Sequence, residues 1–440
     1  MKFTKVNAWR IPSGSAKRVR HNGVTLWTPP DARYVSLGDS IAVGHRINSR
    51  WEIDYGWDAQ YGVGGRTETV LIPGCYTELI HRDLLRTKKC VVNTTTFAKS
   101  GDRVDDLIEK LGHGKVQQTI AQADYVTLCI GANDVLEPAL SHLQDYIWYG
   151  DIDELNRIVD NNLAVLADDS NPNSYTALFN KLSAINPNAK YVFTTIYNPY
   201  KYLYLEEGRN GFFKPLLDLI PSMYIDVDKM IEDAFLGGKD LAYYDIRRWR
   251  WVSIELGLDL RDIIIGGVLT THYFLQFFDR INQMSSRGEN YVTRLNNVLK
   301  EKINAYRATN PNFYVADTKA VFDTYPDRQT PADVHYNDLV NVEFTRGYDV
   351  SKIDWGAIWR PEYGSNSGKF YLDLAMKHLS FRNALPSTNV WDYVSFDLEG
   401  FASDLINLAI SRVFEANVDP HPEEMGHIVL KNTFAGVLQY

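Results

Sequence analysis

Two residues near opposite ends of the chain have the types that nucleophilic catalysis needs. Ser40 follows the apolar run 34–37 and the pair Gly38-Asp39, and His421 stands in an Asp-Pro-His-Pro segment. A serine delivered by a strand end onto a tight turn after glycine exposes its hydroxyl and points its backbone N–H outward. A histidine within reach would take the proton of that hydroxyl. The two residues predict a hydrolase.

Two polar blocks between these residues could stabilise a developing negative charge. Gly101 lies in a Ser-Gly-Asp block after the strand-like run 91–96, and Asn133 lies in a Gly-Ala-Asn-Asp block after the apolar run 125–130. Glycine lets its backbone N–H approach a ligand closely, and asparagine offers an amide donor. With the N–H of Ser40, these donors would cradle the oxygen of a carbonyl during acyl transfer. We therefore expect Ser40, Gly101 and Asn133 to form an oxyanion hole.

These segments resemble the four sequence blocks of the SGNH (GDSL) hydrolase family. The likeness is carried by Gly-Asp-Ser-Ile-Ala-Val-Gly at 38–44, by Gly101, by 131–134 and by the segment around His421, in the family's order. Each block follows a predicted strand or stands near the carboxyl edge of the sheet, where ligands of open α/β sheets bind. The resemblance implies a serine esterase without a cofactor, in which the histidine accepts the serine proton and an aspartate orients the ring.

The position of that aspartate departs from the family pattern. The family places it three residues before the histidine, where this chain has Val418; the nearest acid is Asp419, two residues before His421. Pro420 fixes its own φ and biases Asp419 toward extended geometry, from which the carboxylate could still turn back to the ring. We predict Asp419 as the orienting acid. The alternative is a backbone carbonyl in that role, which leaves a Ser–His dyad.

Two other histidines compete for a place in the site. His427 falls within the helix predicted after His421, where capping or packing is expected. His45 is close to Ser40 and could bind substrate, but a solvated loop histidine is the simpler interpretation. No cluster has metal-ligand spacing, so neither a metal nor another cofactor is predicted.

Composition limits the class of protein. The chain has 440 residues, of which 45% are hydrophobic and 13% aromatic, enough for a sizeable core. The net charge of -9, with no basic patch, argues against nucleic acid or an anionic membrane as a partner. Its three cysteines are expected to be reduced core residues. The first residues lack a signal-peptide pattern, so we expect a soluble protein, either cytoplasmic or virion-associated.

The alternation of strand-like and helical runs predicts a three-layer α/β/α sandwich around a five-stranded parallel sheet, a flavodoxin-like architecture. A helix is expected at 291–308 as a crossover. The expected strands are 34–37, 91–96, 125–130, 191–196 and 314–316. The strand order 2-1-3-4-5 is implied by the family resemblance.

The remaining segments flank or interrupt this pattern. Residues 1–33 contain an Asn-Gly turn signal at 22–23, predict a β-hairpin, and resemble short β segments of bacteriophage tail and virion proteins. Residues 34–440 are predicted to form the catalytic domain, with cap-like insertions at about 201–288 and 326–416. The insertions are rich in aromatic residues, which either form their own core or stack on sugar rings.

Together these features predict a serine esterase that hydrolyses a carboxylic ester, with O-deacetylation of a bacterial surface polysaccharide as the first expectation. Two alternatives are open. One is a lipase- or thioesterase-like hydrolase of other acyl esters. The other is a non-catalytic glycan- or receptor-binding virion protein on a hydrolase scaffold, with other phage proteins as partners. The sequence does not predict an oligomeric state.

Overall fold

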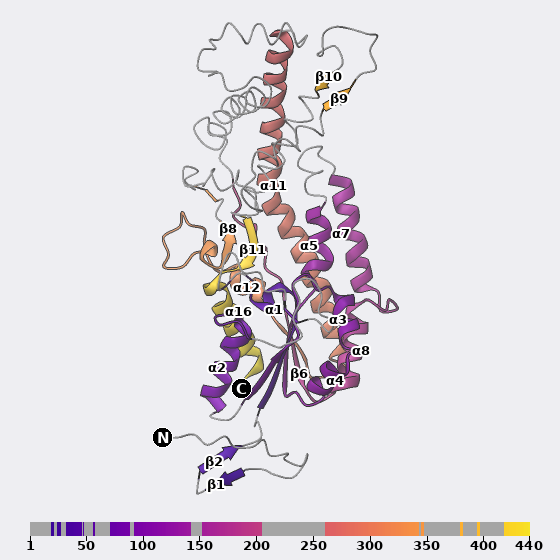
Figure 1. The fold of residues 1–440 in the computed structure, drawn as a ribbon, viewed down its shortest axis with the longest axis vertical. Helices are drawn as coiled ribbons and strands as arrows, with labels where there is room; N and C mark the ends of the chain where they lie inside the picture. Colours follow the sequence, from indigo (N-terminus) through magenta and orange to yellow (C-terminus); the bar gives the residue numbers. More distant parts are fainter. Residues whose placement is uncertain are drawn as a thin grey trace.

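A parallel sheet of five strands occupies the centre of the fold (Figure 1). The computed structural model describes residues 19–21, 24–27, 32–45, 47, 56–57, 71–88, 92–141, 152–204, 260–342, 345–346, 379–381, 394–396 and 418–440. The strands, in spatial order, are β4 (Val92–Thr96), β3 (Ala32–Gly38), β5 (Tyr125–Cys129), β6 (Lys190–Thr194) and β7 (Phe313–Ala316). The predicted order, with the second strand outside the first, is confirmed.

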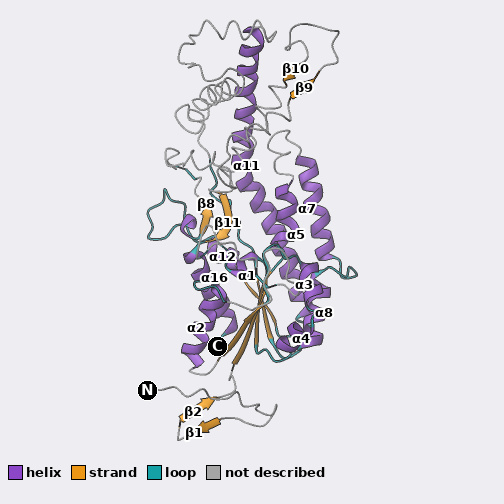
Figure 2. Ribbon diagram, viewed as in Figure 1, coloured by secondary structure: helices purple, strands orange, loops and turns teal. Residues whose placement is uncertain are grey.

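Helices cover both faces of the sheet (Figure 2). Strand β3 is buried along nearly its whole length, as expected for a parallel strand with helices on either side. One face carries α2 (Tyr76–Lys88) and α16 (Glu424–Leu438). The other carries α3 (Val104–Lys110), α4 (Gly114–Ile120) and α8 (Tyr175–Ile185). The three-layer sandwich is therefore as predicted.

The crossover helix before β7 is much longer than the sequence pattern indicates. Helix α11 spans Leu260–Tyr306, whereas the sequence predicts a helix at 291–308. No proline interrupts this stretch, so the backbone hydrogen bonding can continue through it. At 1.5 Å per residue its length is about 70 Å, and it runs well beyond the sheet alongside α5 (Ala132–Ser141) and α7 (Ile152–Ala167).

Short elements complete the described part of the chain. Strand β11 (Val418–Pro422) pairs antiparallel with β8 (Val340–Val342), and β1 (Val19–His21) pairs antiparallel with β2 (Val24–Trp27). The others are α1 (Ser40–Val43), α12 (Thr318–Phe322), the 3-10 turn Tyr336–Asp338, β9 (Leu379–Phe381) and β10 (Val394–Phe396). Trp249 and Trp355, two of the aromatic residues in the predicted insertions, lie outside the described residues.

The last helix fixes the C-terminal segment against the beginning of the domain. Lys431 of α16 forms an ion pair with Asp83 of α2 at 2.9 Å, and the ammonium of Lys190 donates to the carbonyl of Val437 at 2.7 Å. His427 is fully buried between the helices, where its ring stacks on Tyr76. These contacts bring the residues after 418 beside the carboxyl edge of the sheet.

Two cysteines belong to this core. Cys75 and Cys129 are buried free thiols, and Cys90 lies outside the described residues. In the described part of the chain, no helix has the length and apolar character needed to cross a bilayer.

Candidate active site

The turn that carries Ser40 is tightly packed against the neighbouring strand. Gly38, the last residue of β3, has φ +132°, and a Cβ there would lie 2.0 Å from the carbonyl oxygen of Cys129. The same carbonyl accepts the N–H of Asp39 at 3.0 Å, and the Gly38 carbonyl accepts the N–H of Lys99 at 2.9 Å. Only glycine fits this position. The turn therefore holds Ser40 rigidly at the first residue of α1.

Asp39 caps the helix that Ser40 begins. Its carboxylate accepts the N–H of Ile41 at 3.1 Å, as an N-cap side chain does. Asp39 is almost completely buried, and burial raises the pKa of its carboxyl to about 7. The cap therefore fixes the start of α1, although its carboxyl is close to its protonation midpoint at neutral pH.

The two predicted oxyanion donors lie beside Ser40 on different segments. Gly101 has φ +83° and lines the same cavity as Ser40. Asn133 is the second residue of α5, and its side-chain amide donates to the carbonyl of Asp102 at 3.0 Å. Because a primary amide carries two N–H donors, this bond fixes the side chain and leaves a second donor. Lys110 in turn forms a buried ion pair with the Asp102 carboxylate, which anchors the loop.

The C-terminal segment presents His421 with an acid behind it. The Asp419 carboxylate lies 2.5 Å from Nδ1 of His421 and accepts the His421 backbone N–H at 3.0 Å. Side chains two residues apart on a strand point to the same face, so β11 places the Asp419 carboxylate beside the His421 ring. The Tyr197 hydroxyl holds the segment by donating to the Pro420 carbonyl at 2.7 Å.

His45 also belongs to this site, in contrast to the solvated loop histidine expected from the sequence. Its ring stacks on that of His421, with centroids 4.5 Å apart and an interplanar angle of 27°. Its Nδ1 lies 3.1 Å from the Ser100 hydroxyl. Gly44, in the left-handed region with φ +85°, ends α1 and turns the chain toward this position. The one sequence signal for His45 is its closeness to Ser40 along the chain.

His427, the other rival, is a packing residue. Its Nδ1 accepts the N–H of Tyr76 at 3.2 Å. Burial lowers the pKa of His427 to about 3, so the ring is neutral at physiological pH. It does not line the cavity at Ser40, in agreement with the role expected from its place inside a helix.

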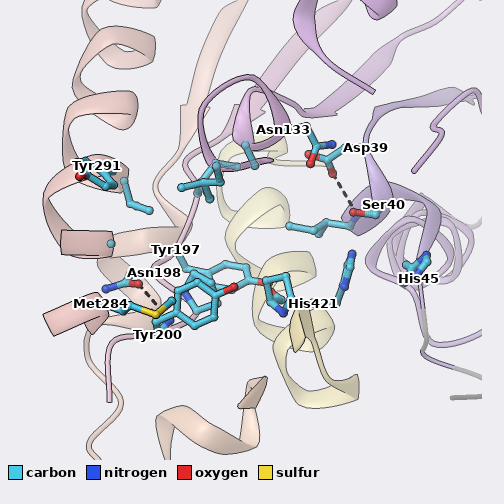
Figure 3. A pocket seen from close by; sticks show the side chains of 18 of the residues that line it. Asp39, Ser40, His45, Asn133, Tyr197, Asn198, Tyr200, Met284, Tyr291 and His421 are labelled. Atoms are coloured by element: carbon cyan, nitrogen blue, oxygen red, sulfur yellow. Dashed lines mark hydrogen bonds between the residues drawn. The ribbon is translucent and has the colours of Figure 1, made fainter. Parts of the chain in front are cut away.

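One cavity of about 310 Å³ joins the predicted residues (Figure 3). Ser40, Gly101, Asn133 and His421 all line it, and Asp419 lies behind the histidine ring. Within the described residues, the Ser40 hydroxyl and the His421 ring are not hydrogen-bonded to each other. Polar residues that line the cavity beside them are Asp39, His45, Ser100, Asn198 and Arg287.

Sequence reasoning missed most of the cavity wall. Leu155 comes from α7, and Met284 and Tyr291 come from α11. Neither helix carries one of the predicted blocks. No local pattern marks them, because each looks like an ordinary apolar position on an amphipathic helix. The segment 196–200 is different, since it follows the fourth core strand and thus reaches the same edge of the sheet.

Comparisons with known proteins give short or distant matches. The chain matches no protein-family profile. It is 46% identical over 57 residues to the uncharacterized protein YpmR of Bacillus subtilis (strain 168). That match covers 12% of this chain and 22% of YpmR, so less than a quarter of the relative's length is spanned.

Several solved structures are similar at low identity. An extracellular lipase from Streptomyces rimosus is 14% identical, with 66% of this chain and 82% of the lipase covered and a TM-score of 0.34. Phospholipase A1 from Streptomyces albidoflavus NA297 is 15% identical, with coverages of 69% and 91% and a TM-score of 0.32. A variant of the acetyl xylan esterase Axe2 from Geobacillus stearothermophilus is 11% identical, with coverages of 93% and 95% and a TM-score of 0.30.

The sheet order β4-β3-β5-β6-β7, with helices on both faces, is established by the strand pairing itself. The chain therefore has a three-layer α/β/α fold with the strand order 2-1-3-4-5.

Proposed function

We propose that this protein is a serine hydrolase that cleaves a carboxylic ester through an acyl-enzyme. The observation that carries the proposal is the convergence of Ser40, Gly101, Asn133 and His421 on one cavity from four separate segments. The contact between Asp419 and Nδ1 of His421 supports it. A nucleophile, a base, an acid that orients the base and a set of N–H donors are the parts that acyl transfer requires.

In the proposed mechanism the Ser40 Oγ attacks the ester carbonyl while Nε2 of His421 takes its proton. Asp419 holds the proton on Nδ1, which keeps Nε2 free to act as the base. The N–H groups of Ser40, Gly101 and Asn133 donate to the tetrahedral oxyanion. His421 then protonates the leaving alcohol, and a water molecule, activated by the same ring, releases the acid from Ser40.

The sequence-based candidate for the ester is an acetyl group on a bacterial surface polysaccharide. It rests on the aromatic insertions and on the virion-like segment 1–33, which also suggests association with a phage particle. A second candidate, an ester of a longer acyl chain, is favoured by the apolar side chains that line the cavity. Release of acetate or of fatty acid distinguishes the two.

Substitution of the nucleophile tests the proposal. Ser40→Ala should abolish hydrolysis of p-nitrophenyl esters, whereas Ser170→Ala, at an exposed serine of a surface turn, should leave the rate unchanged. Asn133→Ala should lower turnover by about 10²–10³ because one oxyanion donor is lost. A fluorophosphonate probe, mapped by mass spectrometry, should label Ser40. Parent-like activity of a folded Ser40→Ala protein would refute the assignment.

The alternative of a binding protein without catalysis makes a different prediction. A folded parent protein that binds glycans, hydrolyses no ester and takes no fluorophosphonate label would favour that alternative. The simultaneous presence of a serine, an oxyanion-type asparagine and an acid-paired histidine at one cavity favours catalysis.

A further inference from the structure

The cavity at Ser40 has a wall of apolar side chains that the catalytic residues do not explain. We infer that this wall binds the acyl chain of the ester and that the preferred chain is longer than acetyl. The inference rests on the proposed function and names the substrate class of the same site.

The wall is built by three helices that pack against one another. Leu136 comes from α5, Leu155 from α7, and Met284 and Val292 from α11. The last three side chains are at most 6% exposed. Apolar side chains facing a cavity gain free energy when an apolar ligand replaces water there. The wall therefore favours a hydrocarbon.

The tyrosines of the cavity strengthen this assignment, because two of their hydroxyls are bound elsewhere. The Tyr197 hydroxyl donates to the Pro420 carbonyl at 2.7 Å, and the Tyr291 hydroxyl donates to the side-chain oxygen of Asn156 at 2.8 Å. Both residues line the cavity, so what they offer a ligand is their rings. Rings whose hydroxyls are already engaged suit a hydrocarbon chain better than a sugar, which needs hydrogen bonds as well as a stacking face.

The size of the cavity also argues for more than an acetyl group. Its 310 Å³ lies at the lower end of cavities that enclose a small molecule, about 300–1,000 Å³. An acetyl group adds one methyl beyond the carbonyl carbon, comparable in size to a water molecule, whose share of liquid volume is about 30 Å³. The acetyl methyl would leave most of the cavity unfilled. A longer acyl chain would fill more of the cavity volume.

The place of Leu136 beside the predicted oxyanion donor supports the acyl side for this wall. Figure 3 shows Ser40 and His45 toward one end, with Met284 and Tyr291 at the other. The leaving alcohol must lie near the histidine ring, because that ring protonates it. On α5, Leu136 follows the donor Asn133 by three residues, which places the two on the same side of the helix. A chain bound by the wall would thus begin beside the oxyanion donor, on the acyl side of the ester.

A series of p-nitrophenyl esters from acetate to laurate tests the inference in the parent protein. We expect kcat/KM to rise by about fourfold for each methylene buried, since one buried CH₂ contributes about 0.8 kcal/mol. The rise should stop at a medium chain length, when the cavity is full. A steady fall in kcat/KM from acetate onward would overturn the inference.

Variants of one wall residue make the test specific. Leu155→Phe narrows the cavity and should move the best chain to a shorter length. Leu155→Ala should move the best chain to a longer length. The matched control is Val165→Phe, which adds a ring to the same helix at a position 38% exposed and away from the cavity; it should leave the profile unchanged.

The Ser40 and Leu155 variants together distinguish an error in the acyl wall from an error in the proposed function. An inactive Ser40→Ala protein together with chain-length profiles that do not respond to Leu155→Phe and Leu155→Ala would refute the acyl wall alone. A Ser40→Ala protein with parent-like activity would refute the proposed function as well. Melting curves identify a variant that does not fold, and the opposite substitution at Leu155 then decides the question.

Discussion

At the scale of single residues, the contact between Asp419 and His421 is the main departure from the SGNH sequence pattern. The acid stands one position closer to the histidine than in the family, yet its carboxylate lies 2.5 Å from Nδ1. Both residues belong to strand β11, on which side chains two positions apart point to the same face. A spacing of two residues therefore also allows the contact.

The substitution Asp419→Asn should lower kcat by roughly 10³–10⁴, because an amide can no longer favour the Nδ1–H tautomer of His421. Steady-state hydrolysis of a p-nitrophenyl ester measures this loss. Glu424→Gln, at an exposed acid in the first turn of α16, is the matched control and should retain parent activity. A loss below about tenfold would assign the orientation of the ring to another group.

His45 should act as a positioning residue for the His421 ring, which lies between the Asp419 carboxylate at its edge and His45 at its face. Removing the stacked ring with His45→Ala should lower kcat by about tenfold to a hundredfold, because small displacements of a catalytic group are costly. His45→Phe keeps an aromatic face and should recover most of the rate. Equal losses in both variants would show that stacking is not what His45 provides.

At the scale of elements, the strand ends decide where the proposed catalytic groups meet. Strands β3 and β5 pair in register up to Gly38 and Cys129, so the segments after them emerge at the same edge. The apolar runs in the sequence predict all five strands to within two residues at each end. The long helix α11 is only partly predicted, because its first half carries no pattern that separates it from an insertion.

Glycines at this edge provide a test of the tight turn. Gly38→Ala should lower the free energy of unfolding by more than about 3 kcal/mol, because a positive φ and a 2.0 Å clash with the Cys129 carbonyl act together. Gly101 also has a positive φ, but a Cβ added there would have no atom within 4 Å. Gly101→Ala should therefore lower the free energy of unfolding by only about 1–2 kcal/mol. Urea denaturation of both variants gives the comparison. Equal losses would contradict the packing described for β3 and β5.

At the scale of the whole molecule, buried ionisable groups couple folding to pH. Burial lowers the pKa of His427 from 6.5 to about 3. Between these values the unfolded chain binds a proton that the folded chain excludes, so stability from this group falls as the pH falls from 6.5 toward 3. Asp39 has the opposite effect, because burial raises the pKa of its carboxyl from 3.8 to about 7. Its contribution to the free energy of unfolding therefore falls as the pH rises between these values.

The variant His427→Phe should therefore be less sensitive to acid than the parent. A phenyl ring can keep the stack on Tyr76, and it has no group to protonate. The unfolded histidine takes up its proton as the pH falls from about 6.5 to about 4. Over this range the urea midpoint of the variant should change less than that of the parent. Parallel curves for the two proteins would show that another group controls acid unfolding.

The sequence predicts the sheet and the residues at its edge, because both follow from local runs and from the strand ends. It does not predict His45 as part of the site or the wall formed by Leu155 and Met284, since those depend on the packing of helices distant in sequence. The strand order also needs the family resemblance. Local patterns specify elements, whereas their assembly depends on contacts across hundreds of residues.

The docking of α16 against α2 has a consequence for how the protein is made. At about 5–20 residues per second, a ribosome that has finished Ser40 needs roughly 20 to 80 s more to reach His421. Throughout that interval the nascent serine lacks its proposed proton acceptor, so we expect no acylation of Ser40 by cellular esters. Activity would therefore appear in one late step, when α16 packs against α2. After dilution from denaturant, turnover should likewise recover more slowly than the helical circular dichroism signal.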